Sequence, residues 1–238
     1  MALILNIETS TQVCSVAVSE NDKIIGFKET SDEKSHAKFL TVFIDDLLRD
    51  LKLTFSDLDA VAVSKGPGSY TGLRIGVSTA KGLCYAKNLP LIAVNTLQSM
   101  AQGLINKVHQ GEISIPNFNQ SLLVPMIDAR RMEVYSAFFN AGSEYIREVK
   151  AEIIVNESYQ EILQRQQMIF FGNGSEKITE TINHKNALFL KGFFPSAIYM
   201  GQLSNSLYLN KKFEDVAYFE PFYLKDFIAT KPKKNIFK

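Results

Sequence analysis

KGPGSYTGLRIGVSTAKGL, residues 65–83, joins an apolar strand to a helix through three closely spaced glycines. The preceding run, 60–64, is short and largely β-branched, which is typical of a strand buried on both faces. The turn at 66–68 can turn backbone N–H groups outward, and Ser69 is well placed to cap the helix that follows. A capped helix start beside such a turn is a candidate anion site.

The glycine spacing excludes two well-known nucleotide motifs. Gly66, Gly68 and Gly72 form G-x-G-x-x-x-G, one residue too long for the dinucleotide fingerprint, and no Gly-Lys-Ser/Thr follows, so a P-loop is excluded. Arg74, in the first helical turns, could meet a phosphate or a partner's carboxylate. The alternative is a plain strand-to-helix connection with a serine cap, because glycine-rich turns of this kind are common.

Two rows of small residues run along the predicted helix 70–87. One steps by four from Gly72 to Ala80, and the other steps by four from Ser78 to Ala86. Each glycine inside a helix costs on the order of 1 kcal/mol relative to alanine. Close approach of another element, in the same chain or in a second protein, would offset that cost.

Composition indicates a globular protein without a strong charge. The 238 residues are 46% hydrophobic, enough for one large domain or two ordinary ones. A net charge of +1 provides no general field for nucleic acid. Cys14 and Cys84 lack metal-ligand spacing and are expected to be buried, reduced thiols of a cytoplasmic protein. No signal peptide or membrane span is expected, because no apolar stretch reaches roughly 18 residues.

The apolar patterns predict one order of elements twice. The first half has strands at 3–8, 13–19, 23–30, 60–64 and 91–95, with helices at 36–51, 70–87 and 96–109. The second half has strands at 122–128, 133–140, 144–155, 168–171 and 187–190, with helices near 157–167, from 175, and at about 196–211. The sequence therefore predicts an α/β protein of two duplicated βββαβαβα lobes, 1–109 and 110–238, whose last helix could also pack back on the first lobe. A cleft between such lobes is where open α/β sheets bind ligands.

Five stretches resemble the bacterial TsaB proteins, which help to make threonylcarbamoyladenosine on tRNA. They are Ile7–Ser10, Gly66–Arg74, Ile127–Arg130, Glu133–Tyr135 and Glu220–Leu224. The resemblance covers nearly the whole chain, although 141–215 match weakly. It implies the fold shared by sugar kinases, actin and Hsp70 chaperones (the ASKHA fold), with two duplicated lobes, in agreement with the element order above.

The resemblance implies a non-catalytic scaffold subunit. Proteins like this pair with a catalytic paralogue, TsaD, and through that pair with the ATPase TsaE. The complex uses ATP and threonylcarbamoyl-adenylate to modify N6 of adenosine 37 in tRNAs that read ANN codons. The chain itself would then have no catalytic residue and no tightly bound cofactor, and would form a homodimer when the paralogue is absent.

A metal site is not expected. The paralogue resembles a metalloprotein with a His-x-x-x-His pair at the head of the helix after the fifth strand. Thr96 and Met100 hold those places here, and neither suits Fe or Zn, which need imidazole, carboxylate or thiolate ligands. His36, His109 and His184 share no motif.

Two sets of candidate site residues follow. A vestigial nucleotide cleft is predicted at Glu8, Thr9, Gly66, Gly68, Ser69, Gly172 and Gly174, with the loop 172–175 facing 66–68. A partner-binding surface is predicted at Val42, Arg74, Gly76, Ala80, Gly82 and Leu83. For Glu8 the alternative is a carboxylate that caps a hairpin. For 128–131 a hairpin turn with internal ion pairs is favoured over a catalytic role.

Two other functions stay open. The chain could be an enzyme that acts through the cleft, either an ATP-dependent phosphotransferase or hydrolase, or a metallopeptidase. It could also be a nucleic-acid-binding module acting through the tail 225–238, which carries five lysines and one aspartate.

Overall fold

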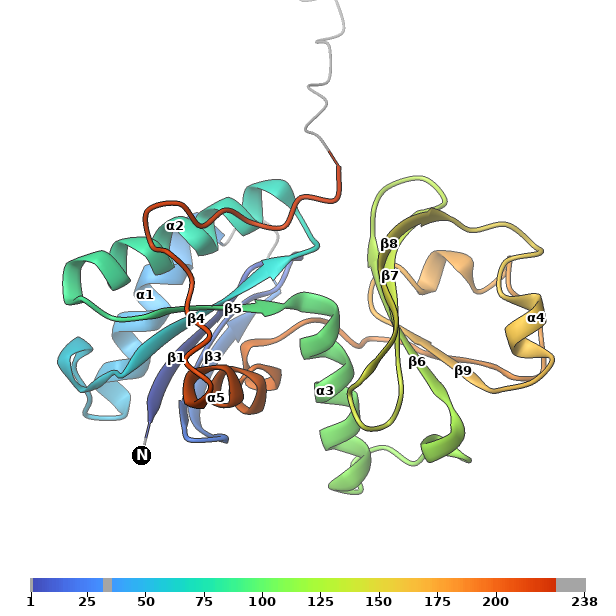
Figure 1. Cartoon of the computed structure of the whole chain (residues 1–238), viewed down its shortest axis with the longest axis horizontal. Helices are drawn as coiled ribbons and strands as arrows, with labels where there is room; N and C mark the ends of the chain where they lie inside the picture. The colour runs from blue at the N-terminus through green and yellow to red at the C-terminus, as the bar shows by residue number, and fades with distance from the viewer. Residues whose placement is uncertain (1, 32–35, 226–238) are drawn as a thin grey trace, which may run out of the picture.

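In this computed structural model, residues 2–31 and 36–225 are described, and they form two lobes, each built on a five-stranded sheet (Figure 1). The basic tail 225–238, for which nucleic-acid binding stays an open alternative, lies outside the described residues from residue 226 onward, as does the side chain of His36. The elements of the first lobe are β1 (Leu3–Glu8), β2 (Cys14–Glu20), β3 (Lys23–Thr30), α1 (His36–Asp50), β4 (Ala60–Gly66), α2 (Tyr70–Lys87), β5 (Leu91–Asn95) and α3 (Thr96–His109).

The second sheet repeats the topology of the first. Its strands are β6 (Leu122–Asp128), β7 (Glu133–Phe139), β8 (Tyr145–Ile153), β9 (Met168–Phe171) and β10 (Ala187–Leu190). The order is β3-β2-β1-β4-β5 in one sheet and, read in the same sense, β8-β7-β6-β9-β10 in the other. In each, the first strand pairs antiparallel with the second and parallel with the fourth. The predicted α/β fold with duplicated sheets is confirmed.

The helices of the second lobe are shorter than predicted. The region 157–167 contributes only one turn, α4 (Gln160–Leu163), and the helix expected from Ser175 is a 3₁₀ turn at Glu176–Ile178. Polar side chains compete with the helix there, because the Ser175 hydroxyl donates to the Gly172 carbonyl and the Thr179 hydroxyl donates to the Glu176 carbonyl.

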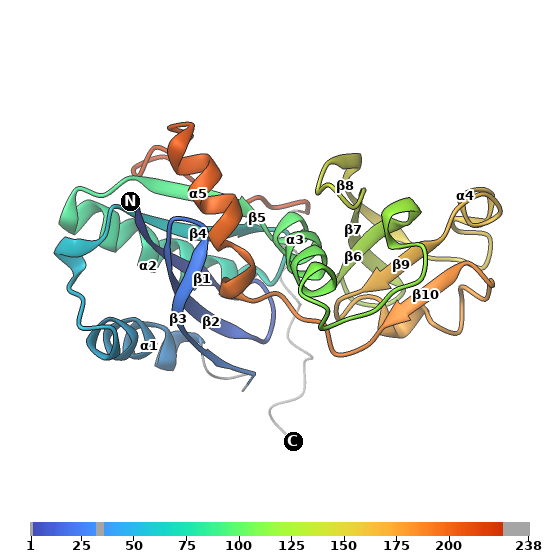
Figure 2. The same ribbon diagram turned by 90° about the horizontal axis from the view of Figure 1, so that it is seen from below.

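Helix α5 (Gly201–Leu209) follows the second sheet in sequence but packs on the first. It contacts β1 and β5, so the first sheet is covered by α1 and α2 on one face and by α5 on the other (Figures 1 and 2). This double cover explains why the residues of β4 from Ala60 to Val63 are all fully buried. The division of the chain at residue 109 stays a prediction, because α3 contacts strands of both sheets.

The turn between β4 and α2 lies directly against the end of β1. The Ser69 hydroxyl accepts from the Gly72 N–H at 3.3 Å, the predicted helix cap, and the Ser69 N–H donates to the Ser10 carbonyl at 2.6 Å. A Cβ added to Gly68 would lie 2.4 Å from the Ser10 carbonyl oxygen. Glycine is therefore required at this position by close backbone contact.

We expect Gly68→Ala to lower the free energy of unfolding by about 1–3 kcal/mol, because the added methyl group overpacks a contact between backbones. The matched change Gly82→Ala should raise it by about 1 kcal/mol, since a Cβ there meets nothing within 4 Å and alanine favours the helix. Denaturant unfolding of both variants tests the difference. Equal effects of the two substitutions would contradict the close contact at Gly68.

Candidate functional site

A cleft of about 990 Å³ lies between the two lobes. The first lobe contributes the ends of β1 and β4 and the start of α2, through residues 10–12 and 67–72. The second lobe contributes residues 127–131 together with Glu133, Tyr135 and Asn173. Residues 222–225 also line it, and they belong to the segment 213–225 that follows α5, here called the strap.

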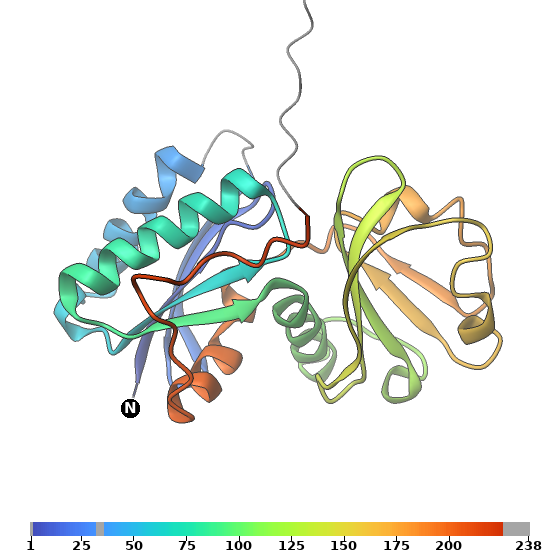
Figure 3. The same ribbon diagram turned by 45° about the horizontal axis from the view of Figure 1, so that its top comes forward.

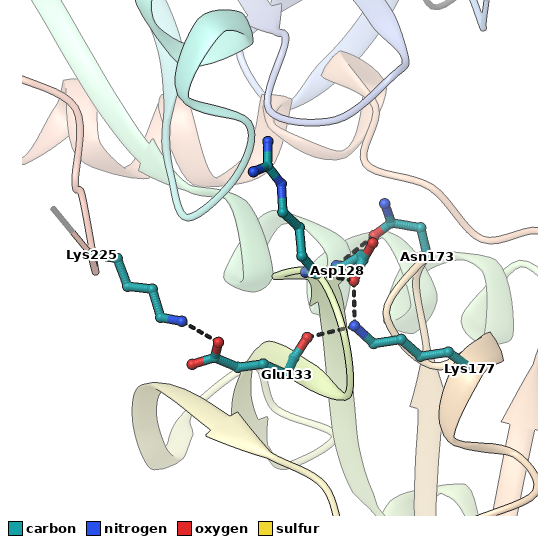
Figure 4. A network of polar contacts seen from close by, with 6 residues as sticks. Asp128, Glu133, Asn173, Lys177 and Lys225 are labelled. Atoms are coloured by element: carbon teal, nitrogen blue, oxygen red, sulfur yellow. Dashed lines mark hydrogen bonds and ion pairs between the residues drawn. The ribbon is translucent and has the colours of Figure 1, made fainter. Parts of the chain in front are cut away.

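The second-lobe wall of the cleft is a network of charged side chains (Figure 4). Lys177 pairs with the Asp128 carboxylate and donates to the Glu133 carbonyl at 2.6 Å, while Asn173 accepts from the Asp128 N–H at 3.1 Å. The predicted hairpin turn is present, and Asp128 Oδ1 accepts from the Arg130 N–H at 2.9 Å, but the ion pair of Asp128 is with Lys177 of another loop and is not internal to the turn. Arg130 and Arg131 also line the cleft, on the same wall as Asp128 and Glu133.

Glu8 is buried beneath the cleft. Its Oε1 accepts from the Ser10 N–H at 2.6 Å and from the Ser64 hydroxyl at 2.9 Å, and the residue is fully buried. Desolvation by burial raises the pKa of the Glu8 carboxyl above 4.5, against the opposing hydrogen bonds from Ser10 and Ser64. This geometry matches the alternative role foreseen for Glu8, a carboxylate that caps the hairpin after β1.

Of the predicted nucleotide-site residues, only Gly68 and Ser69 line the cleft. Glu8 and Thr9 lie below its surface, and the Thr9 hydroxyl donates to the Gly72 carbonyl at 2.8 Å. A Cβ on Gly172 would meet the Met126 carbonyl, and one on Gly174 would meet Ile127. These two glycines therefore pack the loop onto β6, and the residue between them, Asn173, is the one that faces the cleft.

Helix α2 has three faces, and the residues of the predicted partner surface that belong to this helix do not all lie on the same one. Gly76 and Ala80 face the interior: a Cβ on Gly76 would lie 2.2 Å from the Thr9 hydroxyl, and Ala80 is fully buried. The prediction that these two residues contact a partner is corrected, because β1 of the same chain covers them. Leu83 is half-buried against the first-lobe core.

The remaining predicted residues are exposed. Arg74 lies on a second face of α2, where its guanidinium stacks over Tyr70 at 4.2 Å and its Nε donates to the Tyr223 hydroxyl at 3.4 Å. Gly82 lies on the third face with open space around it, and Val42 of α1 is 48% exposed. The row from Ser78 to Ala86 is thus the small-residue row that faces solvent.

The positions that would carry a metal-binding histidine pair are closed. Thr96 and Met100 are fully buried at the start of α3, and the Met100 methyl group packs against Gly172. Among residues 2–31 and 36–225 there is no group of three His, Cys, Asp or Glu side chains arranged to hold a metal ion. The His184 side chain stabilises the turn in which it lies, because its Nδ1 accepts from the Asn186 N–H at 3.1 Å.

No sequence pattern predicts that the strap reaches the cleft. Residues 220–224 belong to a stretch that carries the family resemblance, but their composition has no periodicity that would place them in the fold. Ser10, Thr11, Gln12 and Tyr135 also line the cleft and were not predicted to do so. Ser10 and Tyr135 belong to stretches that carry the family resemblance, and Thr11 and Gln12 directly follow one of them.

Comparison with known proteins identifies the family. Residues 15–233 match the family model described as TsaD: tRNA N6-adenosine threonylcarbamoyltransferase. Over 237 residues the chain is 30% identical to the tRNA threonylcarbamoyladenosine biosynthesis protein TsaB of Escherichia coli (strain K12), which covers 96% of each chain. The chain belongs to the TsaB family.

The similarity to the Escherichia coli and Bacillus subtilis TsaB proteins extends over more of the chain than the similarity to a transferase does. The Bacillus subtilis TsaB is 29% identical over 93% of each chain. A tRNA N6-adenosine threonylcarbamoyltransferase of Thermosipho melanesiensis is 30% identical, but over only 56% of this chain and 43% of its own length. The TsaB family takes part in the biosynthesis of tRNA threonylcarbamoyladenosine, and full-length similarity assigns this chain to it.

The fold agrees with solved TsaB-like structures. YeaZ from Pseudomonas aeruginosa has a TM-score of 0.76 and 24% identity, and covers 94% of this chain and 100% of its own. A second Pseudomonas aeruginosa structure, described as similar to peptidase YEAZ, has a TM-score of 0.80 at 23% identity, with the same coverage. Within the described part of this TsaB family member, no helix is both long and apolar enough to cross a membrane.

The burial of Glu8 predicts a pH dependence of stability. A carboxyl whose folded pKa is raised contributes stability that is complete below the unfolded pKa, near 4.5, and is lost as the pH rises through the folded pKa. Glu8→Gln keeps an acceptor for Ser10 and Ser64 but cannot ionise. We expect this variant to lose less thermal stability than the parent between pH 4.5 and neutrality.

Thermal melts across that range make the test, with Glu20→Gln as the control for loss of a carboxylate at an exposed strand end. If Glu8→Gln and Glu20→Gln give the same pH profile as the parent protein, the carboxyl of Glu8 does not couple to folding.

Proposed function

We propose that this chain is the scaffold subunit of the complex that adds threonylcarbamoyl to N6 of adenosine 37 in tRNAs reading ANN codons. In this role it binds and supports a TsaD-like catalytic subunit and, through that pair, a TsaE-like ATPase. The complex uses ATP and threonylcarbamoyl-adenylate and contacts tRNA, while this chain holds no cofactor tightly. A role in tRNA modification places this protein in the cytoplasm.

The observation that carries the proposal is the chemistry at the head of α3. Thr96 and Met100 are buried without a ligating nitrogen, carboxylate or thiolate, at the place where a catalytic paralogue would need a histidine pair. Glu8, the other candidate for chemistry, is engaged by Ser10 and Ser64 below the cleft surface. A subunit without these groups contributes by binding.

The surface that fits a partner is the third face of α2 with the neighbouring part of α1. Ser78, Gly82 and Ala86 present almost no side chain there, which lets a helix of another protein approach closely, and Val42 adds exposed apolar area. Because the fold is duplicated between paralogues, the same surface serves a TsaD-like partner and a second copy of this chain. The two assemblies compete.

A second function, that of an enzyme, is favoured only by the cleft itself. A space of about 990 Å³ with Arg130 and Arg131 on one wall is large enough for a nucleotide. An ATP-dependent phosphotransferase or hydrolase, or a metallopeptidase, would use this cleft. Such a reaction would lack an exposed carboxylate at the end of β1, because Glu8 is buried.

We expect the purified protein to hold well under one equivalent of Fe or Zn, and its melting temperature to be unchanged by a chelator, since Thr96 and Met100 cannot ligate these metals. Isothermal titration with Mg-ATP should give no saturable heat. About one equivalent of metal, or saturable Mg-ATP binding, would instead support the enzyme. A salt-dependent shift of tRNA by the isolated chain would support a nucleic-acid-binding module.

For the partner surface, we expect Gly82→Leu to weaken binding of the TsaD-like paralogue roughly tenfold to a hundredfold, because overpacking the centre of an interface costs about 1–3 kcal/mol. Calorimetry with the purified paralogue measures this, and ultracentrifugation of the chain alone should show the homodimer weakened in parallel. Glu148→Leu, which places the same exposed apolar side chain on β8, is the control. Undiminished binding by a folded Gly82→Leu variant would place the interface elsewhere.

Ala80→Leu is the complementary test of the corrected assignment. Because Ala80 is packed in the first-lobe core, this variant should lose about 1–3 kcal/mol of folding free energy. Chemical denaturation measures the loss. A stable Ala80→Leu variant that failed only in partner binding would return Ala80 to the interface.

A further inference from the structure

The strap, residues 213–225, is bound to the first lobe along most of its length (Figure 3). The Glu214 N–H donates to the Leu91 carbonyl at 2.8 Å, at the edge of the first sheet. Lys81 of α2 donates to the carbonyls of Ala217 and Phe219, both at 3.0 Å. The side chain of Phe219 packs against the first-lobe core.

The strap then crosses the start of α2. The Phe222 N–H donates to the Lys65 carbonyl at 2.7 Å, which extends the hydrogen bonding at the end of β4. The Tyr223 ring contacts the Tyr70 ring with centroids 5.0 Å apart, and its hydroxyl accepts from Arg74. Backbone, ring and cation contacts thus anchor residues 222 and 223 at the mouth of the cleft.

The next residues reach the other lobe. Lys225 forms an ion pair with the Glu133 carboxylate at the start of β7 (Figure 4). Glu133 is itself held, because its carbonyl accepts from Lys177, whose ammonium group also pairs with Asp128. The ion pair therefore joins the strap to a network that belongs wholly to the second lobe.

The Lys225–Glu133 contact is important because the covalent connections between the lobes do not by themselves fix the distance across the cleft. The chain crosses through α3 and returns through residues 191–200, and these two crossings pack against each other: a Cβ on Gly103 would lie 2.4 Å from the Tyr199 ring, and Gln102 donates to Gln202 at 2.9 Å. Two crossings that meet in one place permit the lobes to hinge about it. A third contact across the cleft restrains that motion.

We propose that the strap is a clasp that sets the spacing of the two lobes, with the Lys225–Glu133 ion pair as its releasable end and the Tyr223–Tyr70–Arg74 stack as its fixed end. The pair is suited to release, since the Lys225 and Glu133 side chains are 44% and 21% exposed and surface ion pairs are weak. The fixed end lies on α2, so the spacing of the lobes is coupled to the helix whose third face is open. This inference concerns the chain alone and does not rest on the proposed function.

The test measures the distance between the lobes in the full chain. Spin labels at Lys87→Cys on α2 and Lys150→Cys on β8 report it, and labelling of the parent protein controls for the buried Cys14 and Cys84. Lys225→Glu and Glu133→Lys are each compared with the double exchange and with Lys212→Glu. Lys212→Glu is the control, because it makes the same charge change as Lys225→Glu at an exposed position next to the strap.

We expect each single reversal to raise the population of longer distances roughly two- to fivefold, the shift that loss of a weak ion pair produces. The double exchange should restore the parent distribution, which a merely structural effect of either substitution would not do. Single reversals that match Lys212→Glu, or a double exchange that behaves like the single reversals, would overturn the clasp.

The fixed end is tested by the same labels. Tyr223→Ala removes the ring from Tyr70 and should release the lobes, whereas Tyr223→Phe keeps the ring and should leave the distribution close to that of the parent. Far-ultraviolet circular dichroism verifies that both variants are folded. If a folded Tyr223→Ala variant retains the parent distribution, the strap does not hold the lobes and the proposal fails.

Discussion

Close contact between the end of β1 and the turn leading into α2 is the constraint on which the first lobe depends. Added Cβ atoms at Gly68, Gly72 and Gly76 would each lie within 2.4 Å of Ser10 or Thr9. Glycine inside a helix costs on the order of 1 kcal/mol relative to alanine, so the close packing must offset that cost. Once this contact is made, the rotation of α2 about its axis is fixed, because only the glycine row can face β1. The Thr9 hydroxyl, which donates to the Gly72 carbonyl, completes the contact with a directional bond.

Fixing that rotation assigns the other two faces of α2. The face with Arg74 and Lys81 turns toward the strap, and both side chains bind it through hydrogen bonds. The face with Ser78, Gly82 and Ala86 turns to solvent beside α1. One packing contact in the core therefore determines where a partner can approach and where the strap can attach. Neither surface could move without rotating the glycine row away from β1.

The sequence predicted the parts of this arrangement that depend on local periodicity. The order of the elements along the chain, the buried strand β4 and the cap at Ser69 follow from apolar patterns and from capping chemistry. The predicted helix from Ser175 is too long, because hydroxyl groups that bond to nearby carbonyls shorten a helix without altering its apolar spacing. The predicted helix at 157–167 is also too long, since only α4 forms there. The two small-residue rows of α2 could not be told apart, since i, i+4 spacing is the same in both and only the position of Thr9 decides which is buried. The position of the strap could not be predicted, because a segment without apolar periodicity has no sequence pattern that indicates which elements it packs against.

At the cleft between the two lobes, the side chains that were candidates for chemistry have structural roles. Glu8 retains a carboxyl at the end of β1, but burial and two hydrogen bonds use it to hold the hairpin against Ser64. Met100 is buried beside Gly172, and its thioether packs there but does not bind a hard cation. Asp128 pairs with Lys177 within the second lobe, and Glu133 pairs with Lys225 of the strap, while Arg130 and Arg131 line the same wall of the cleft. The first ion pair holds the turn between β6 and β7 in place, and the second joins that turn to the strap, so together they define the position of one lobe relative to the other.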